Sequence, residues 1–207
     1  LIRSLKKTYI FKNKKCLITA GPTIEPIDKI RYLSNHSSGK QGYEIAKQMI
    51  LSGANVTLIS GPTNLPAPLR VKLIKIQTAE EMYNAVKKHL KKDIAIFTAA
   101  VADVSPKKFS RIKIKKENLN NIVLKRTKDI LYEVALSKKN RPNIVIGFAA
   151  ETNDHIKNAK IKLNKKNCDA IVVNQINDKN KVFGLDMNKV SIITKNKILN
   201  YKKMTKK

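Results

Sequence analysis

Short apolar runs rich in β-branched residues alternate along this chain with longer segments that have helical spacing. The apolar runs are Lys15 to Ala20, Asn55 to Ser60, Val71 to Ile76, Asp93 to Thr98, Asn143 to Ala149 and Asp169 to Val173. Strands that alternate with helices form a mainly parallel sheet, and the helices cover both of its faces. The pattern therefore predicts an α/β, Rossmann-like fold.

The helical segments carry signals for where helices begin and end. Apolar side chains at helical spacing stop at Gly53, a residue type that commonly ends helices. Thr78 and Glu81 have the spacing of a capping box, which predicts a helix start. In this way we predict helices over residues 38 to 52, 78 to about 91, 129 to 137 and 154 to 166.

Three stretches interrupt the alternation. Residues 21 to 37 form a long connection where a short turn would be ordinary, and long structured loops are more often functional than idle. Residues 98 to 120 contain Ala-Ala-Val-Ala-Asp and then a lysine-rich stretch without a clear element. Residues 189 to 202 have the pattern of a C-terminal β-hairpin that turns at Lys195-Asn196.

Length and composition exclude several classes of protein. A hydrophobic content of 42% is too high for a disordered chain, and no apolar run reaches the roughly 18 residues needed to cross a membrane. The first residues lack the apolar stretch of a secretory signal, so we expect a cytoplasmic protein. Cys16 and Cys168 lie in or beside apolar runs, which favours core thiols over a metal site. We expect a linker-like segment over 1 to 14, one domain over 15 to 200 and a frayed basic tail over 201 to 207.

The formal net charge of +28 leaves two classes of partner open. A basic nucleic-acid-binding module is one of them, because lysine and arginine neutralise phosphates. Against it, lysine supplies nearly all of the 43 basic residues, aromatic content is 5%, and no aromatic platform is interleaved among the lysines. We therefore expect no nucleic-acid partner, and most lysines should occupy solvated positions around a site for small anions.

The turn after the first apolar run excludes two common nucleotide-binding motifs. A dinucleotide-binding enzyme would have GxGxxG there, whereas residues 20 to 26 read Ala-Gly-Pro-Thr-Ile-Glu-Pro. Gly39-Lys40 is not a P-loop, because the first glycine and the hydroxyl residue after the lysine are missing. Ser37, Ser38 and Gly39 remain at a predicted helix start, where backbone N–H groups favour a phosphate or carboxylate. Alternatively, Ser38 only caps the helix and the glycines allow close packing.

Seven strings stand out between about residues 15 and 194, namely ITAGPTIEP, RYLSNHSSGKQGYEIA, GANVTLISGPT, AAVAD, KIKK, GFAAET and KKNCDAIVVN. In their order and spacing they resemble the phosphopantothenate–cysteine ligase family of coenzyme A synthesis. In many bacteria such a ligase is the C-terminal half of a bifunctional protein, and the N-terminal half is a flavin-dependent decarboxylase. The resemblance thus implies a fused or separate flavoprotein decarboxylase as partner, with FMN only if that half is fused upstream.

The resemblance also implies a reaction. Similar enzymes join the carboxylate of 4'-phosphopantothenate to CTP and release pyrophosphate. The amine of L-cysteine then attacks the acyl-cytidylate to give phosphopantothenoylcysteine and CMP. Because the substrates of the first step are anions, lysines and Mg²⁺ bound with the nucleotide should dominate its chemistry. The family further implies a homodimer with the active site across its two-fold interface.

The family pattern assigns roles to particular positions. Lys113 resembles a loop lysine that closes over the triphosphate, Asn35 an uncharged donor for the cysteine step, and Arg31 a ligand of the phosphopantothenate phosphate. The implied nucleotide- and anion-binding residues, besides Lys113, are Ser37, Ser38, Gly39, Ala99, Ala100, Asp103, Asp129, Ile130, Phe148, Lys162 and Lys166.

Plainer alternatives stand beside these assignments. Asp103 would otherwise be a cap of a helix or turn, and Phe148 an ordinary core side chain. We favour a structural role for His36 over that of a general base. The segment Arg126-Thr127-Lys128-Asp129 departs from the Lys-Asn-Pro-Asp-like string usual in the family. This departure leaves open a degraded ligase kept only for assembly.

Overall fold

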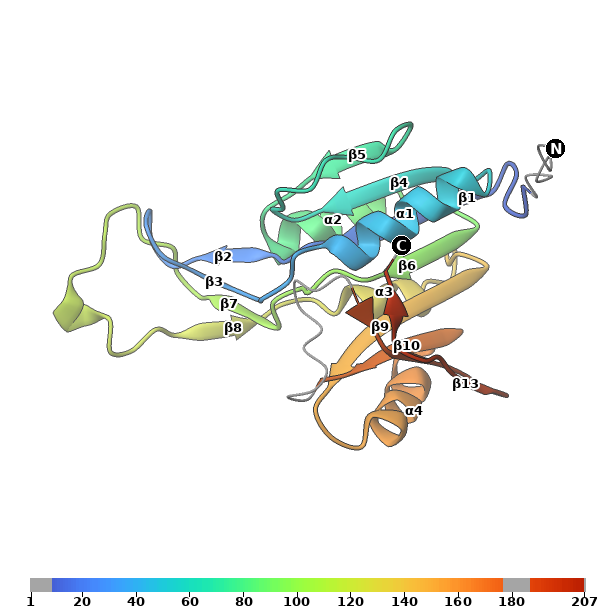
Figure 1. Cartoon of the computed structure of the whole chain (residues 1–207). Coiled ribbons are helices and arrows are strands. Elements are labelled where there is room, and N and C mark those ends of the chain that lie inside the picture. Colours follow the sequence, from blue (N-terminus) through green and yellow to red (C-terminus); the bar gives the residue numbers. More distant parts are fainter. Residues whose placement is uncertain (1–8, 177–186, 207) are drawn as a thin grey trace.

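A computed structural model describes residues 9–176 and 187–206 and has a single large sheet at its centre (Figure 1). Its strands are β1 (Lys15–Ala20), β4 (Asn55–Ser60), β5 (Lys72–Lys75), β6 (Ile94–Phe97), β9 (Ile144–Glu151), β10 (Ala170–Gln175), β12 (Val190–Thr194) and β13 (Ile198–Asn200). Their order in the sheet is β13-β12-β10-β9-β6-β1-β4-β5. Neighbours from β10 to β5 pair in parallel, whereas β12 and β13 are antiparallel. The predicted α/β fold and its C-terminal hairpin are confirmed.

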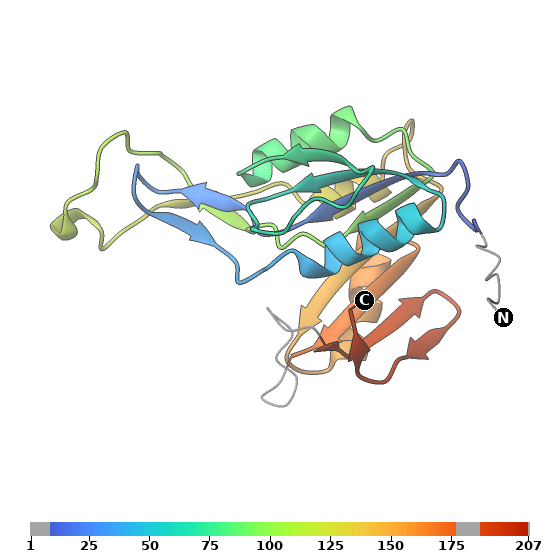
Figure 2. The ribbon, with the colours of Figure 1, turned by 45° about the horizontal axis from the view of Figure 1, so that its top comes forward.

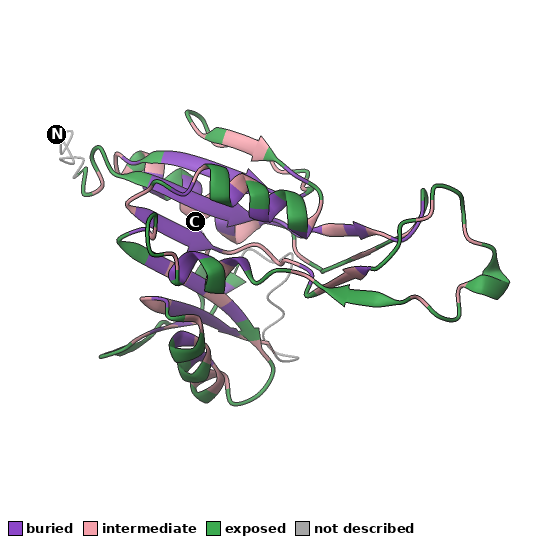
Figure 3. Ribbon diagram, turned by 180° about the vertical axis from the view of Figure 1, so that it is seen from behind, coloured by how far each residue is buried: buried purple, intermediate pink, exposed green. Residues whose placement is uncertain are grey.

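Helices cover both faces of the sheet. They are α1 (Lys40–Leu51), α2 (Ala79–Lys88), α3 (Ile130–Ala135) and α4 (His155–Lys166). Side chains alternate along β1, so Leu17 packs in the core under α2, α3 and α4, while Ile18 packs in the core under α1. Figure 1 accordingly shows α1 in front of the sheet and α2 behind it. Figure 3 shows the buried residues concentrated on the central strands.

Capping explains where two helices begin. The backbone N–H of Glu81 donates to Thr78 Oγ1 at 3.1 Å, and Glu81 Oε2 accepts from the N–H of Gln77 at 2.7 Å. The predicted cap by Thr78 is confirmed. In a capping box the Glu81 carboxylate would accept from the N–H of Thr78, whereas here it accepts from Gln77, one residue earlier. Helix α1 starts at Lys40, two residues later than expected, because its N-cap Gly39 has a left-handed φ of 76°.

Two short ribbons project from the sheet where β1 and β6 end (Figure 2). One pairs β2 (Ile24–Pro26) with β3 (Tyr32–Ser34), and the other pairs β7 (Val104–Pro106) with β8 (Leu124–Arg126). Residues 107–123, which include the 3₁₀ turn Lys116–Asn118, form the far end of the second ribbon. The sequence predicted no strand in these two connections, since three-residue strands are too short for a periodic pattern.

The two ends of the described chain pack against the body. Phe11, within the expected linker, packs on the α1 side of the core and its N–H donates to the carbonyl of Ser52 at 2.9 Å. The tail expected to be frayed instead forms β14 (Met204–Thr205), which pairs with β11 (Met187–Asn188). Residues 1–8, 177–186 and 207 lie outside the described residues.

Both cysteines are core thiols, as expected. Cys16 and Cys168 are buried, and neither forms a disulfide. Burial raises the pKa of Cys16 to about 12 and that of Cys168 to about 11.

Within residues 9–176 and 187–206, no helix is both long and apolar enough to span a bilayer.

Candidate active site

A cavity of about 670 Å³, here called the α4 cavity, is lined by residues that follow β6 and by residues of β9, α3 and α4. Ligands of open α/β sheets bind at the carboxyl ends of parallel strands, and the segment after β6 lies at such an end. The cavity gathers seven residues of the implied nucleotide site, namely Ala99, Asp103, Asp129, Ile130, Phe148, Lys162 and Lys166. Residues from four separate segments of the sequence thus meet around one space.

Two lysines of α4 give this cavity its cationic wall. Lys162 Nζ lies 2.5 Å from Glu151 Oε1, at the end of β9. Lys166 forms an ion pair with Asp129, the N-cap of α3. Each ammonium is therefore neutralised by a carboxylate from a neighbouring element. An incoming phosphate would have to compete with these carboxylates for the lysines.

The segment that departs from the family pattern still forms part of the cavity wall. Residues 126–129 all line the α4 cavity. Thr127 donates through Oγ1 to the carbonyl of Ala102 at 2.6 Å, and its N–H donates to the carbonyl of Asp103 at 3.0 Å. Lys128 Nζ lies 4.2 Å from the centroid of the Tyr83 ring. Thr127 thereby fastens this segment to the turn that carries Asp103.

A second cavity of about 200 Å³, the α1 cavity, lies at the N-terminus of α1. Ser37, Ser38, Gly39 and Ala100 line it. The N-cap of α1 is Gly39, which makes no side-chain capping bond, but Ser38 Oγ accepts from the N–H of Lys40 at 3.5 Å. Ser38 therefore makes a capping contact, as the plainer alternative expected, and also lines the cavity. The close-packing alternative does hold for Gly42, where an added Cβ would lie 2.6 Å from the Cβ of Ala20.

The two cavities share Ala99 and Phe148. Phe148 is half-buried and also packs against the α1 side of the core, so it serves both the core and the cavity walls. Asn35 is exposed, and its Nδ2 donates to the carbonyl of Ala100 at 3.0 Å, beside the α1 cavity. His36 is exposed and lines neither cavity.

Arg31 and Lys113 lie on the ribbons and line neither cavity. Lys113 is exposed on the 107–123 loop. Arg31, at the start of the β3 side of its turn, donates through Nε to Asp28 Oδ2 at 3.0 Å and through Nη2 to the carbonyl of Ile114 at 2.6 Å. A single chain therefore does not bring these two residues together with the lysines of α4.

Sequence reasoning missed two amides in the α1 cavity. Asn174 and Asn188 both line it and are buried, and the Oδ1 atom of each has no hydrogen-bond partner. Asn188 Nδ2 donates to Gln41 Oε1 at 3.1 Å. Asn174 gave one usable signal, since it is a polar residue at the end of an apolar run. Asn188 gave none, because the pairing of β11 with β14 places it.

Comparison with known proteins gives a consistent picture. Residues 11–207 match the family described as DNA/pantothenate metabolism flavoprotein C-terminal domain. The chain is 47% identical over 206 residues to the Coenzyme A biosynthesis bifunctional protein CoaBC of Borreliella burgdorferi, covering 97% of this chain and 51% of that protein. It is 44% identical over 182 residues to CoaBC of Escherichia coli, covering 86% of this chain and 45% of that protein. The chain spans about half the length of these curated relatives.

Solved structures agree with this result. A crystal structure of the C-terminal domain of CoaBC has a TM-score of 0.80 and 39% sequence identity, and covers 95% of this chain and 89% of that domain. A Cab2 mutant in complex with phosphopantothenate-cysteine shares the fold at a TM-score of 0.75 and 16% identity, with 93% of this chain and 82% of that chain covered. The chain belongs to the DNA/pantothenate metabolism flavoprotein C-terminal domain family and corresponds to the C-terminal half of the bifunctional CoaBC proteins.

Proposed function

We propose that this chain is a CTP-dependent phosphopantothenate–cysteine ligase of coenzyme A biosynthesis. It joins 4'-phosphopantothenate to L-cysteine through an acyl-cytidylate and releases pyrophosphate and CMP. The observation that carries the proposal is the α4 cavity, where seven residues of the family's nucleotide pattern meet. The CoaBC proteins named above, at 39% to 47% identity, are proteins of coenzyme A biosynthesis, which supports the same pathway for this chain.

In the first half-reaction, the lysines of α4 bind the triphosphate. Lys162 and Lys166 exchange their carboxylate partners for phosphate oxygens, which lowers the charge that opposes attack by the carboxylate of phosphopantothenate. One carboxylate oxygen then bonds to the α-phosphorus, and pyrophosphate leaves. Phe148 offers an apolar surface for the base, and Asp103 lines the same cavity.

Mg²⁺ fits this site as a companion of the nucleotide. Among the described residues, no three His, Cys, Asp or Glu side chains are grouped as a metal site. Such a cage is not required, because Mg²⁺ is usually held by one or two carboxylates together with substrate phosphates and water. Asp103 and Asp129 line the cavity and are the carboxylates that would hold it. When bound, the ion neutralises phosphate charge. FMN is needed only by a decarboxylase half fused upstream.

In the second half-reaction, the shared wall of the two cavities is where the acyl group meets cysteine. The N-terminus of α1 suits the phosphate of phosphopantothenate because of its N–H groups and its dipole. Asn35 donates one N–H of its side-chain amide to the carbonyl of Ala100. The second N–H of this amide would donate to the developing oxyanion. The neutral cysteine amine attacks the carbonyl carbon, the acyl–oxygen bond breaks, CMP leaves without protonation, and the nitrogen releases one proton to water.

A homodimer is part of the proposal. The ribbons expose apolar side chains, among them Ile30 at 62%, Ile112 at 76% and Val123 at 65%. Burial of such a set against a second copy would stabilise a dimer. Lys113, whose loop lies on the second ribbon, would then reach a triphosphate bound in the cavity of the other protomer.

A product assay tests the proposal. The protein is incubated with CTP, 4'-phosphopantothenate, L-cysteine and Mg²⁺, and the products are analysed by mass spectrometry. We expect pyrophosphate, CMP and phosphopantothenoylcysteine in equal amounts. Well-folded protein that gives no cysteine-dependent product would refute the ligase.

A further inference from the structure

The loop that carries Lys113 is fastened to the turn between β2 and β3 on both sides of that lysine. Before it, the N–H of Ser110 donates to the carbonyl of Ile27 at 3.1 Å. After it, the N–H of Ile114 donates to Asp28 Oδ2 at 3.1 Å, and the carbonyl of Ile114 accepts from Arg31 Nη2 at 2.6 Å. Lys113 itself is exposed. The position of its backbone therefore depends on the turn at Ile27 to Arg31.

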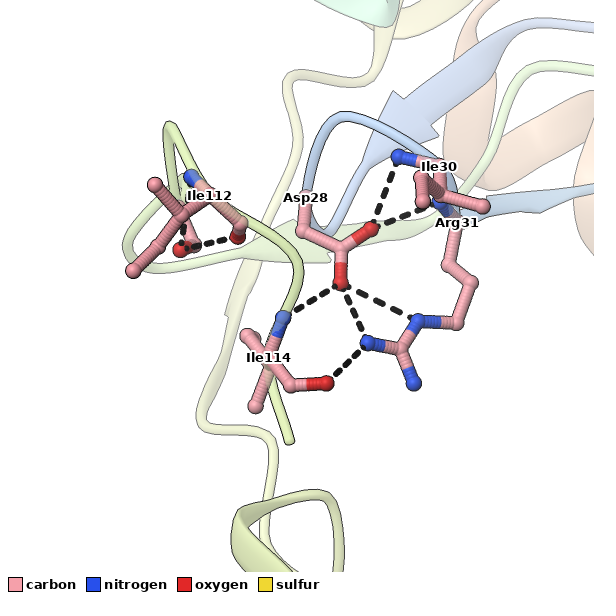
Figure 4. Close-up of polar contacts among 6 residues, drawn as sticks. Asp28, Ile30, Arg31, Ile112 and Ile114 are labelled. Carbon is pink, nitrogen blue, oxygen red and sulfur yellow. Dashed lines mark hydrogen bonds and ion pairs between the residues drawn. The ribbon is translucent and has the colours of Figure 1, made fainter. Parts of the chain in front are cut away.

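Asp28 is the centre of this attachment (Figure 4). Its side chain is 0% exposed, although it lies on a projecting ribbon. Oδ1 accepts from the N–H groups of Ile30 and Arg31, both at 2.8 Å, and Oδ2 accepts from the guanidinium of Arg31 and from the N–H of Ile114. The guanidinium of Arg31, with the N–H groups of Ile30 and Ile114, holds the pKa of this carboxyl well below its usual range.

The negative charge of Asp28 is needed here because the groups around it are cationic. The loop carries the cations Arg111, Lys113, Lys115 and Lys116 on either side of Ile114, whose carbonyl binds the guanidinium of Arg31. The carboxylate of Asp28 neutralises that guanidinium through two of its nitrogens, at 3.0 Å and 2.5 Å. Without it, Arg31 would repel the loop that it now binds through Ile114.

We propose that Asp28 is a positioning residue for Lys113, and that Asp28 and Arg31 together form a latch that holds the 107–123 loop on the β2–β3 turn. The proposal rests on the proposed function, in which Lys113 acts on the triphosphate. It also gives Arg31 a defined part in the first half-reaction, through Ile114 and the loop. In Figure 4 the second terminal nitrogen of Arg31 points away from Asp28, so a contact with a substrate phosphate remains compatible with the latch.

A double-mutant cycle tests whether Asp28 acts through Lys113. Single-turnover release of pyrophosphate is measured without cysteine for the wild type, Asp28→Asn, Lys113→Gln and the double variant. Because a displacement of about 1 Å can cost about 100-fold in rate, we expect Asp28→Asn to lower the rate about 10- to 100-fold. In the Lys113→Gln background the same change should have an effect of less than about twofold. Equal factors in the two backgrounds would overturn the proposal.

Amide hydrogen exchange separates a local from a global effect. Asp28→Asn should speed exchange in residues 108–118 while the protection of β1 and β4 is kept. Asp154→Asn is the matched control, since it removes an exposed carboxylate at the start of α4 and should change neither readout. An Asp28→Asn variant that keeps both the wild-type rate and wild-type loop protection would refute the latch.

A second variant covers the case in which Asp28→Asn does not fold. Arg31→Lys keeps the positive charge but removes the planar fork that reaches both Asp28 and Ile114. It should be non-additive with Lys113→Gln in the same way, and additivity would contradict the proposal. A wild-type protein that releases no pyrophosphate would refute the ligase reaction itself, which distinguishes that failure from failure of the latch.

Discussion

Replacing Lys162 by methionine removes one ammonium from the α4 cavity and keeps a side chain of similar length. In the free chain the ammonium is paired with Glu151 at 2.5 Å, and the lysine side chain is 44% exposed. A triphosphate that binds Lys162 must therefore first displace a partly solvated ion pair. The effect of the substitution on CTP affinity is the difference between these two interactions.

The magnitude follows from typical values. A hydrogen bond to a charged group contributes about 1.5–3 kcal/mol, and an exposed ion pair that is given up costs about 0.2–1 kcal/mol. The net loss should be about 1–2 kcal/mol, which corresponds to about 5- to 30-fold weaker binding of CTP. In the variant Glu151 loses its cationic partner and keeps the hydrogen bond from Asn158 Nδ2, so its negative charge repels phosphate and shifts the expected value toward the upper end.

Isothermal titration of the protein with Mg²⁺-CTP at fixed ionic strength measures this change. The matched control is Lys165→Met, because Lys165 is an exposed neighbour on the same helix that lines neither cavity. We expect the control to alter affinity less than twofold. If both variants weakened CTP equally, only the overall charge would matter, and a specific role for Lys162 would be refuted.

Three further predictions concern packing, the thiols and the second half-reaction. Gly42→Ala should destabilise the fold by about 1–3 kcal/mol in a urea titration, because its Cβ would lie 2.5 Å from Thr98 Oγ1 and 2.6 Å from the Cβ of Ala20; an unchanged midpoint would contradict this packing. Burial raises the pKa of Cys16 to about 12 and of Cys168 to about 11, so both are neutral thiols at pH 8 and should react with iodoacetamide only after denaturation; prompt labelling of native protein would be evidence against that burial. Asn35→Asp should let the acyl-cytidylate accumulate, as seen by mass spectrometry, since a carboxylate cannot stabilise the oxyanion; normal turnover would exclude the role of Asn35.

Long elements were predicted well because their patterns are local. The bounds of β1 and β4 coincide with the predicted runs. Each strand has one exposed residue followed by five buried residues, so the apolar pattern alone marks where it begins and ends. The ribbons were missed, because strands such as Ile24–Pro26 exist only through pairing with a partner. The pairing of Met204–Thr205 with Met187–Asn188 is likewise a tertiary contact without a periodic signal.

The candidate site was predictable only in part. The chain has 43 basic residues, and composition alone does not single out Lys162 and Lys166 among them. Only the resemblance to a family identified these two lysines as candidates. The structure adds that these lysines are paired with carboxylates and that Lys113 lies elsewhere in the chain's own fold. Asp28 gave no signal, because its role depends on a contact with Ile114, 86 residues away.

The central claim is that a carboxylate is activated by attack on the α-phosphorus of CTP in the α4 cavity. Phosphopantothenate labelled with ¹⁸O in its carboxylate tests this claim most directly, with mass analysis of CMP, pyrophosphate and phosphopantothenoylcysteine after turnover. Attack of the carboxylate on the α-phosphorus should leave one labelled oxygen in the phosphate of CMP and none in pyrophosphate. Label in pyrophosphate, or CMP without label, would contradict an acyl-cytidylate.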